Sequence, residues 1–254
     1  MKYAICTVAA APVRKEPAHR AEMTNQLLFG EVMQIGEEKD EWFQIKSLYD
    51  HYEGWLTHHL ITGVEAAVAE APLQYVATAL TNPVTSINEL INAPMGASLT
   101  GLDEETRLLW NHQYKYHGTY RTVPATYSND LLLRLIQQWL NAPYLWGGRT
   151  FMGVDCSGFV QVVFKVLGIP LLRDASLQIT QGNEVENIAA AQTGDVAFFA
   201  NEQGRIVHVG IVLHGNKIAH ASGKVRIDAL TEQGIIHADT GRQTHRLAAI
   251  KRFV

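Results

Sequence analysis

Short apolar runs, separated by polar or glycine-containing breaks, fill the first quarter of the chain. Residues 27–35, 42–46 and 54–56 are rich in β-branched and aromatic side chains, a composition typical of strands. Strands this short leave exposed edges unless the sheet closes on itself. The pattern therefore predicts a small all-β barrel over residues 1–62.

Residues 63–125 keep a non-helical pattern. Two candidate strands, at 76–81 and 97–102, are accompanied by proline-containing breaks at 82–83 and 94–96, which favour turns. We interpret this segment as a second, more divergent barrel of similar size.

The pattern changes after residue 125. Ser128 is a typical helix start, and apolar residues then recur at helical spacing until residues 141–143 end the series: Leu131, Leu132, Leu135, Ile136, Trp139 and Leu140. A second helix begins near Cys156 and is apolar almost all round, which predicts burial. Strand-like segments follow from residue 194 onward. Helices followed by strands predict an α+β domain over residues 126–254.

Composition narrows the range of partners. The chain has 254 residues, and its 21 Lys and Arg against 25 Asp and Glu leave a net charge of −4. A mildly acidic balance argues against nucleic acid and anionic membranes, because both attract concentrated positive charge. No stretch approaches the ~18 apolar residues that span a bilayer, and residues 1–12 resemble the start of a strand more than a signal peptide. We therefore expect a soluble protein.

The two cysteines are too few for a disulfide framework or a four-thiolate zinc site. Cys156 follows a glycine-marked loop at the start of the second helix, where unpaired backbone amides and the helix dipole favour the thiolate. That position suits a nucleophile, and the backbone N–H of Cys156 suits an oxyanion. The alternative is a buried, inert thiol, which is the role we assign to Cys6 in the first barrel.

Several catalytic motifs are absent from the sequence. It contains no His-Glu-x-x-His, no Gly-x-Ser-x-Gly and no Cys-x-x-Cys, the signatures of zinc peptidases, serine hydrolases and dithiol oxidoreductases. We therefore expect no metal site and no cofactor.

A cysteine nucleophile needs a general base, and the base needs an orienting partner. Among the eleven histidines, His208 and His220 each interrupt a strand of apolar or small residues, where a polar side chain needs a partner. If residues 214–216 form the loop between them, Gly210 faces His220 and the two imidazoles are diagonal neighbours on one face. A two-residue loop would put them on opposite faces, and two ordinary core histidines are the other alternative. The remaining histidines lie in polar or loop contexts and receive no role.

Two sets of motifs resemble known families. Residues 13–17, 22–31 and 52–56, with Trp42, resemble a bacterial SH3-like domain. The second set, together with the two histidine strands, resembles the NlpC/P60 cysteine peptidases over residues 126–254; its motifs lie at residues 144–148, 155–159, 173–176 and 193–196.

This resemblance implies a fold and a catalytic triad. The fold class is α+β, with a papain-like NlpC/P60 catalytic domain at residues 126–254 preceded by two small all-β SH3-like barrels at residues 1–62 and 63–125. The triad consists of Cys156 as nucleophile, His208 as general base and His220 as the residue that orients the base.

The whole chain is similar to a narrower group, the γ-D-glutamyl-L-diamino acid endopeptidases, also called dipeptidyl-peptidase VI. This resemblance implies a hydrolase that cuts murein-derived peptides between D-glutamate and the diamino acid and requires a free N-terminal L-alanine. A carboxylate and other acceptors must converge on such an ammonium group. Asp155 is a candidate for that carboxylate, although capping the second helix is an equally good role for it.

The resemblance also implies further substrate contacts at positions that match the family motifs. The candidates are Tyr144, with its hydroxyl near the thiol, and Trp146, Ser157 and Ser176 from the catalytic domain, with Glu22 and Tyr52 from the first barrel. Glu31 and Tyr49 are the alternatives to the last two.

We expect a monomer whose partner is a released murein peptide, L-Ala-γ-D-Glu-diamino acid, and which acts in the cytoplasm. It would be exported if the natural precursor carries a signal peptide. Two alternatives remain open. One is an endopeptidase that remodels intact peptidoglycan and tolerates a blocked alanine amine; the other is a non-catalytic cell-wall-binding protein with an inert thiol.

Overall fold

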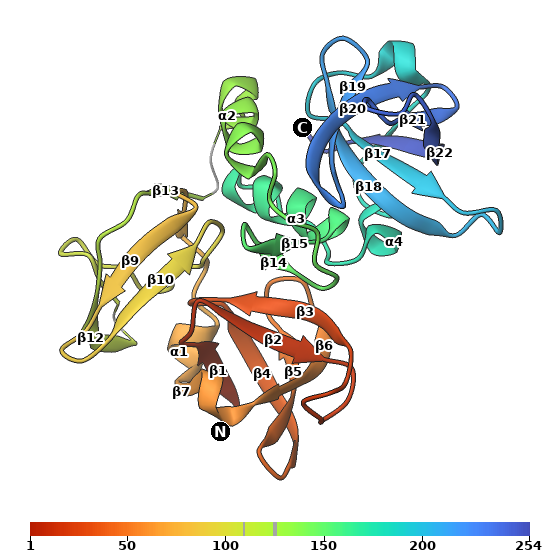
Figure 1. Ribbon diagram of the computed structural model, residues 1–254. Helices are drawn as coiled ribbons and strands as arrows, with labels where there is room; N and C mark the ends of the chain where they lie inside the picture. Colours follow the sequence, from red (N-terminus) through yellow and green to blue (C-terminus); the bar gives the residue numbers. More distant parts are fainter. Residues whose placement is uncertain (109, 124–125) are drawn as a thin grey trace. The chain divides into compact units, whose positions relative to one another are not determined.

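The computed structural model describes residues 1–108, 110–123 and 126–254. The chain divides into two compact units, drawn in Figure 1. The first unit comprises Met1–Thr126 together with Trp146–Phe151, and the second comprises Tyr127–Leu145 and Met152–Val254.

The first unit begins with a seven-stranded antiparallel sheet in the order β3-β2-β6-β5-β4-β1-β7. Its elements are β1 (Tyr3–Cys6), β2 (Ala10–Arg14), β3 (Met23–Leu28), β4 (Val32–Lys39), β5 (Trp42–Ser47), β6 (Glu53–Thr57), the short 3-10 helix η1 (His58–Leu60) and β7 (Ile61–Val64), followed by α1 (Ala66–Ala69). Side chains that alternate along the strands meet in one core, which includes Cys6, Leu27 and Met33. Cys6 is fully buried, and burial raises the pKa of its thiol to about 12, so its prediction as a core residue is confirmed.

The rest of this unit is a second β-rich region. A four-stranded sheet has the order β10-β9-β12-β11, and β13 pairs with β8. The strands are β8 (Tyr75–Ala77), β9 (Thr81–Thr85), β10 (Leu90–Pro94), β11 (Arg107–Leu108), β12 (Asn111–Tyr116) and β13 (Tyr120–Thr122). The break expected at residues 82–83 is wrong, because both residues lie inside β9.

The strand expected at residues 97–102 is also wrong. This segment forms turns with isolated bridges, one of which joins Ser98 to Val76 of β8, and it also packs against the turn between β3 and β4. The Ser98 N–H donates to the carbonyl of Phe29 at 3.0 Å, and the Thr100 hydroxyl donates to the carbonyl of Gly30 at 3.0 Å. Its apolar residues Ala97, Leu99 and Leu102 are buried in the core of this second region, and this burial gives the segment the apolar pattern of a strand.

The segment Trp146–Phe151, which contains β14 (Arg149–Thr150), belongs to the first unit although the flanking residues belong to the second. Its anchor is Arg149, whose side chain is fully buried and paired with the equally buried carboxylate of Glu31. The guanidinium donates to the two Glu31 oxygens at 2.7 and 2.9 Å and to the carbonyl of Gln26 at 2.8 Å. This short segment is thus held by a bidentate, buried ion pair.

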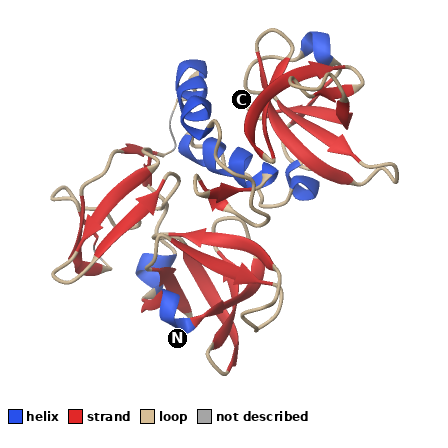
Figure 2. Cartoon of the chain, viewed as in Figure 1, coloured by secondary structure: helices blue, strands red, loops and turns tan. Residues whose placement is uncertain are grey.

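The second unit is α+β, as the order of its elements predicted (Figure 2). Its helices are α2 (Asn129–Trp139), α3 (Cys156–Val166), α4 (Ala175–Gln178) and the 3-10 helix η2 (Ile188–Ala190). Its strands are β15 (Gly153–Val154), β16 (Asn183–Val185), β17 (Val196–Ala200), β18 (Ile206–Leu213), β19 (Lys217–Ser222), β20 (Lys224–Thr231), β21 (Gly234–Ile236) and β22 (Gln243–Arg252).

An antiparallel sheet carries the two histidine candidates, His208 and His220. Its order is β16-β22-β17-β18-β19-β20-β21, and a further pairing of β21 with β22 closes six of the strands into a barrel. Both predicted helices are confirmed at their starts: Ser128 caps α2 by accepting from the Leu131 N–H, and Asp155 caps α3. α3 is buried along its whole length, as its nearly all-round apolar pattern predicted.

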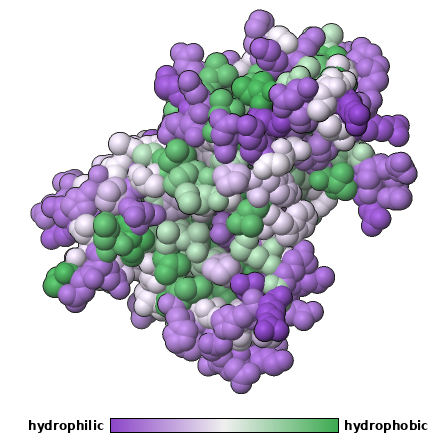
Figure 3. Space-filling view, viewed as in Figure 1, coloured by the Kyte–Doolittle hydropathy of each residue, from purple (hydrophilic) through white to green (hydrophobic). Residues whose placement is uncertain are grey.

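The surface carries scattered apolar side chains. Figure 3 shows hydrophobic residues lying between hydrophilic ones on the face that it draws, and Ile87, Met152 and Val207 are among the exposed large apolar residues. Within the described part of the chain, no helix has the length and apolar character to cross a membrane.

Candidate active site

The N-terminus of α3 positions Cys156. Asp155, in extended conformation, accepts a hydrogen bond from the Gly158 N–H at 2.7 Å and so starts the helix at the cysteine. The Cys156 thiol is hydrogen-bonded by the backbone of Val209 and of Ser157. Because Val209 follows His208 directly in β18, this contact places the thiol beside the strand that carries the candidate base.

The register of β18 and β19 brings the two histidines together. Leu213 pairs with Lys217 and Gly210 pairs with His220, so the three-residue loop and the diagonal arrangement that the sequence predicted are confirmed. His208 and His220 are buried, and Nε2 of His208 lies 2.8 Å from Nδ1 of His220. Gly210 makes this contact possible, because a Cβ at that position would lie 2.9 Å from the Cβ of His220.

Asp228 on β20 extends this chain by one residue, and the sequence reasoning missed it. The carboxylate of Asp228 is 2.9 Å from Nε2 of His220, and it also accepts two hydrogen bonds from Arg226 and one from the Ala238 N–H. Burial alone would raise the pKa of Asp228, but these hydrogen bonds hold it below the usual value. The same register argument, continued across the tight turn at Gly223, places Asp228 diagonally from His220, so the signal was present in the sequence.

The network fixes the tautomers of both histidines. Ionised Asp228 accepts the Nε2–H of His220, which leaves Nδ1 of His220 to accept from Nε2 of His208. The lone pair of His208 is therefore on Nδ1. Burial, with the nearby His245 and His220, lowers the pKa of His208 well below its usual 6.5, so the imidazole is neutral and able to accept a proton.

A second buried cluster, at the N-terminus of α3, consists of Asp155, Ser157 and Arg173. Arg173 donates to both carboxylate oxygens of Asp155, at 3.0 and 2.6 Å, and to the Ser157 hydroxyl at 2.8 Å. The Asp155 carboxylate thus both caps α3 and forms an ion pair with Arg173. Arg173 was not assigned a role from the sequence, whereas Ser176, which was, is exposed on α4.

Tyr144 lies within electrostatic reach of this cluster. Burial raises the pKa of its phenol to about 12, and the charges of Cys156 and Asp155 add to the rise. The hydroxyl is therefore neutral and available as a hydrogen-bond donor near the thiol.

In the first unit, Glu22 lies beside Trp146, and Tyr52 lies beside Thr24. The indole Nε1–H of Trp146 donates to the carboxylate of Glu22 at 2.8 Å, and the Tyr52 hydroxyl donates to the carbonyl of Thr24 at 3.5 Å. The motifs singled out Glu22, Tyr52 and Trp146 separately, and all three lie in the first unit.

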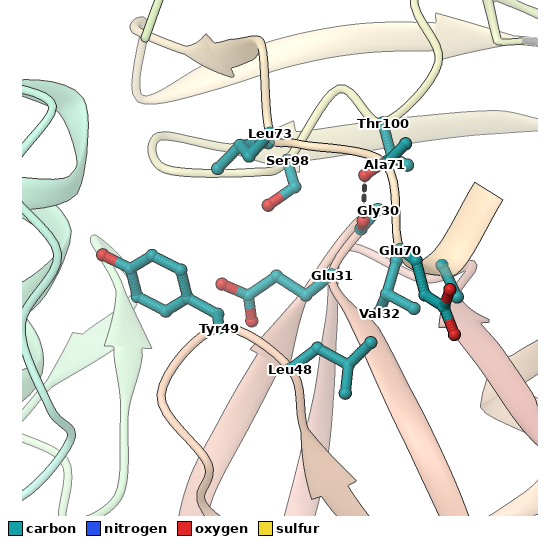
Figure 4. Close-up of a pocket in the computed structure, with 11 residues that line it drawn as sticks. Gly30, Glu31, Val32, Leu48, Tyr49, Glu70, Ala71, Leu73, Ser98 and Thr100 are labelled. Atoms are coloured by element: carbon teal, nitrogen blue, oxygen red, sulfur yellow. Dashed lines mark hydrogen bonds between the residues drawn. The ribbon is translucent and has the colours of Figure 1, made fainter. Parts of the chain in front are cut away.

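The alternative pair, Glu31 and Tyr49, lines a cavity of about 300 Å³ (Figure 4). The Glu31 carboxylate is already bound by Arg149 and by the Leu28 N–H at 2.9 Å. An incoming ammonium group would have to compete with a buried guanidinium for it. This geometry favours Glu22 over Glu31 as a substrate contact.

The comparisons with known proteins agree with this geometry. The model of the NlpC/P60 family matches residues 141–243, and the model described as bacterial dipeptidyl-peptidase Sh3 domain matches residues 13–60. A probable endopeptidase NlpC homolog from Haemophilus influenzae is 31% identical over 156 residues, which are 59% of this chain and 80% of the relative. The chain belongs to the NlpC/P60 family.

Similarity to NlpC/P60 proteins extends over most of the chain. A γ-D-glutamyl-L-lysine dipeptidyl-peptidase from Bacillus subtilis is 28% identical over 228 residues, covering 82% of this chain and 76% of the relative. The crystal structure of an NlpC/P60 family protein from Bacillus cereus has a TM-score of 0.82 at 21% identity and covers 99% of both chains, so the fold is shared. The protein is a cysteine peptidase of the NlpC/P60 family with an SH3-like domain at its N-terminal end.

In this NlpC/P60 peptidase the thiol is not acidic, contrary to the expectation from its place at a helix start. Burial raises the pKa of Cys156 to about 12, and Asp155 adds to the rise, whereas the Val209 backbone, Arg173 and the Ser157 backbone lower it. The loss of hydration raises the pKa more than the backbone amides lower it, because Cys156 is only 6% exposed. The resting NlpC/P60 site therefore holds a neutral thiol beside a neutral imidazole.

This protonation state predicts how Cys156 reacts with iodoacetamide. The thiolate is the reactive species, and a raised pKa keeps its population small at every pH below that value, so the alkylation rate should rise about tenfold per pH unit from roughly pH 6 to pH 9. Mass spectrometry of the modified peptide measures the rate at Cys156 separately from that at buried Cys6. A rate that is the same at both ends of this range would show a thiolate–imidazolium pair instead.

The same NlpC/P60 site has no evident metal-binding group. Across residues 1–108, 110–123 and 126–254, no three His, Cys, Asp or Glu side chains are grouped so as to hold a metal ion.

Proposed function

We propose that this peptidase hydrolyses the bond between γ-D-glutamate and the diamino acid in murein peptides that bear a free N-terminal L-alanine. The observation that carries the proposal is the chain of hydrogen bonds from His208 through His220 to Asp228, with the Cys156 thiol at the backbone of Val209. The name of the Bacillus subtilis relative, a γ-D-glutamyl-L-lysine dipeptidyl-peptidase, supports this choice of bond.

The proposed reaction begins with transfer of the Cys156 proton to Nδ1 of His208 while the sulfur attacks the γ-glutamyl carbonyl. The Cys156 backbone N–H stabilises the oxyanion. His220 and Asp228 stabilise the imidazolium of His208, since its Nε2–H points along the hydrogen-bond chain toward a carboxylate.

Collapse of the tetrahedral intermediate breaks the peptide bond, and His208 gives its proton to the departing amine of the diamino acid. A water molecule, deprotonated by His208, then hydrolyses the thioester and regenerates the thiol. The products are the dipeptide L-Ala-D-Glu and the diamino acid or its C-terminal extension.

Several side chains are proposed to hold the substrate. Asp155, Ser157 and Tyr144 adjoin the thiol, and Arg173 orients the first two. From the first unit we propose Glu22, Tyr52 and Trp146, supported by the hydrogen bond between Glu22 and the indole of Trp146. We also propose Ser176, which is exposed on α4.

The wider organisation is part of the same proposal. We propose a division into residues 1–62, 63–125 and 126–254, with residues 63–125 as a second SH3-like domain. Its buried core contains residues such as Val84 and Leu99, together with Phe29 from residues 1–62. A monomer acting on released murein peptides in the cytoplasm fits a requirement for a free alanine amine, because that amine is blocked in intact peptidoglycan.

Replacing Glu22 with glutamine tests the role of its charge. The variant keeps an oxygen acceptor for the Trp146 indole but loses the negative charge, so kcat/KM for a free-amine tetrapeptide should fall about 10- to 100-fold, chiefly through KM, as expected for a hydrogen bond to a charged group. Glu53→Gln, at an exposed carboxylate of the same sheet, is the matched control and should change nothing. An unaltered KM in Glu22→Gln would remove Glu22 from the substrate site.

A further inference from the structure

The ring of His208 is enclosed by other rings. His245, on β22, stacks against it with centroids 4.0 Å apart and planes inclined by only 23°. His220 meets the same ring edge-on at 5.0 Å and 87°, and Phe199 is tilted against it at 5.8 Å. One of the histidines without an assigned role in the sequence is thus the closest ring neighbour of the candidate base.

A hydrogen bond and a stacking contact constrain different motions. The bond from Nε2 of His208 to Nδ1 of His220 restrains one corner of the imidazole, but the ring can still turn to some extent about its Cβ–Cγ bond. Such a turn would carry Nδ1, at another corner, away from the thiol. A flat face pressed against the ring at 4.0 Å opposes this rotation.

His245 is itself firmly placed. Its Nδ1 lies 2.9 Å from the Thr244 hydroxyl, and Phe199 meets its ring edge-on at 6.0 Å. Its carbonyl lies against Gly234, where a Cβ would approach to 1.7 Å and where φ is +138°, so a glycine is needed there for β21 to lie this close to β22. The backbone that presents His245 is therefore specified by the fold.

The environment of His245 keeps it neutral. Burial lowers its pKa to about 4, with nearby His220 adding to the effect and Asp228 opposing it. These two groups and His208 are the titratable side chains that act on it or stack against it in this network. A neutral ring does not repel the imidazolium that forms on His208 during the reaction.

We propose that His245 is a positioning residue for the general base: its neutral ring stacks on His208 and holds Nδ1 in the orientation needed to take the proton of Cys156. The inference rests on the proposed function, since it requires His208 to be the base. It assigns His245 no proton transfer, because the stacked rings meet face to face.

The test compares three variants with the free-amine tetrapeptide as substrate. His245→Ala removes the ring, His245→Leu fills the volume without a flat face, and His245→Phe keeps a flat ring that cannot titrate. We expect kcat to fall about tenfold in the first two with KM within about twofold, because small errors of orientation cost rate rather than binding. His245→Phe should retain kcat within about threefold of the natural enzyme.

Controls separate this role from others. Arg246→Ala, at an exposed neighbour on β22, should leave kcat and KM unchanged, and thermal unfolding of each variant shows whether β22 is intact. A loss in His245→Phe as large as that in His245→Ala would overturn the proposal, because it would show that a nitrogen of His245 is required. Natural kcat in His245→Leu would overturn it as well, and failure of the natural enzyme to cleave the tetrapeptide would overturn the proposed function itself.

Discussion

Cys156→Ala should lose at least about 10⁴-fold in kcat, because the variant has no nucleophile and only the oxyanion donor and binding groups remain. The fold should survive, since the change removes one sulfur atom from the first residue of α3 while the cap by Asp155 persists. The measurements are turnover of L-Ala-γ-D-Glu-meso-diaminopimelate and the thermal unfolding midpoint. The pairing of lost turnover with an unchanged midpoint is the expected signature of a nucleophile.

The second cysteine supplies the matched control. Cys6 is fully buried in the first sheet, so Cys6→Ala should lower stability by about 1 kcal/mol and leave turnover per folded molecule unchanged. Appreciable turnover in Cys156→Ala, or a loss of turnover in Cys6→Ala without unfolding, would contradict the assignment of the nucleophile.

Breaking the buried ion pair of Arg149 and Glu31 should strongly destabilise the first unit. Both side chains are fully buried, and removing one partner leaves an uncompensated charge in a medium of low dielectric. Arg149→Met is therefore expected to lower the free energy of unfolding by about 3–5 kcal/mol, measured by urea denaturation followed by tryptophan fluorescence.

A double variant distinguishes charge from packing. Arg149→Met combined with Glu31→Leu removes both charges, so it should recover most of the loss seen in Arg149→Met alone. The exposed pair of Lys46 and Glu53 is the reference, because breaking it by Glu53→Gln should cost less than about 1 kcal/mol. An Arg149→Met protein as stable as the natural one would contradict the expected cost of leaving the Glu31 carboxylate buried and unpaired.

Local patterns account for the parts of the fold that could be predicted. Ser128 and the apolar spacing after it define α2, and the glycine-marked loop defines the start of α3 at Cys156. The hairpin of β18 and β19 was predictable because its loop length fixes which side chains share a face. These features depend on residues close together in the sequence, and the structure confirms them.

Groups that come from distant segments were missed. Asp228 reaches His220 from β20, His245 reaches His208 from β22, and Arg173 reaches Asp155 from the segment after α3. Closure of the barrel by β21 and β22 brings β22 to the histidines, and periodicity along one strand contains no information about such closure. Asp228 could have been found by extending the register one strand further; His245 could not.

The pKa of Cys156 was misjudged for a related reason. The sequence shows that the residue starts a helix, which favours the thiolate, but it does not show how completely the thiol is removed from water. Burial raises the pKa to about 12, so the resting cysteine is a neutral thiol rather than the favoured thiolate. The apolar pattern of residues 97–102 predicts one strand, but the segment keeps only isolated bridges at Ser98 and Leu102, and its apolar side chains are buried in the core beside Phe29.

Mass spectrometry of the products from two tetrapeptides tests the central claim most directly. One substrate is L-Ala-γ-D-Glu-meso-diaminopimelate-D-Ala with a free amine, and the other is the same peptide with the alanine amine blocked by muramic acid. The proposed function predicts L-Ala-D-Glu and the diaminopimelate-D-Ala dipeptide from the first substrate and the intact peptide from the second. Equal cleavage of both, or cleavage at a different bond, would contradict it.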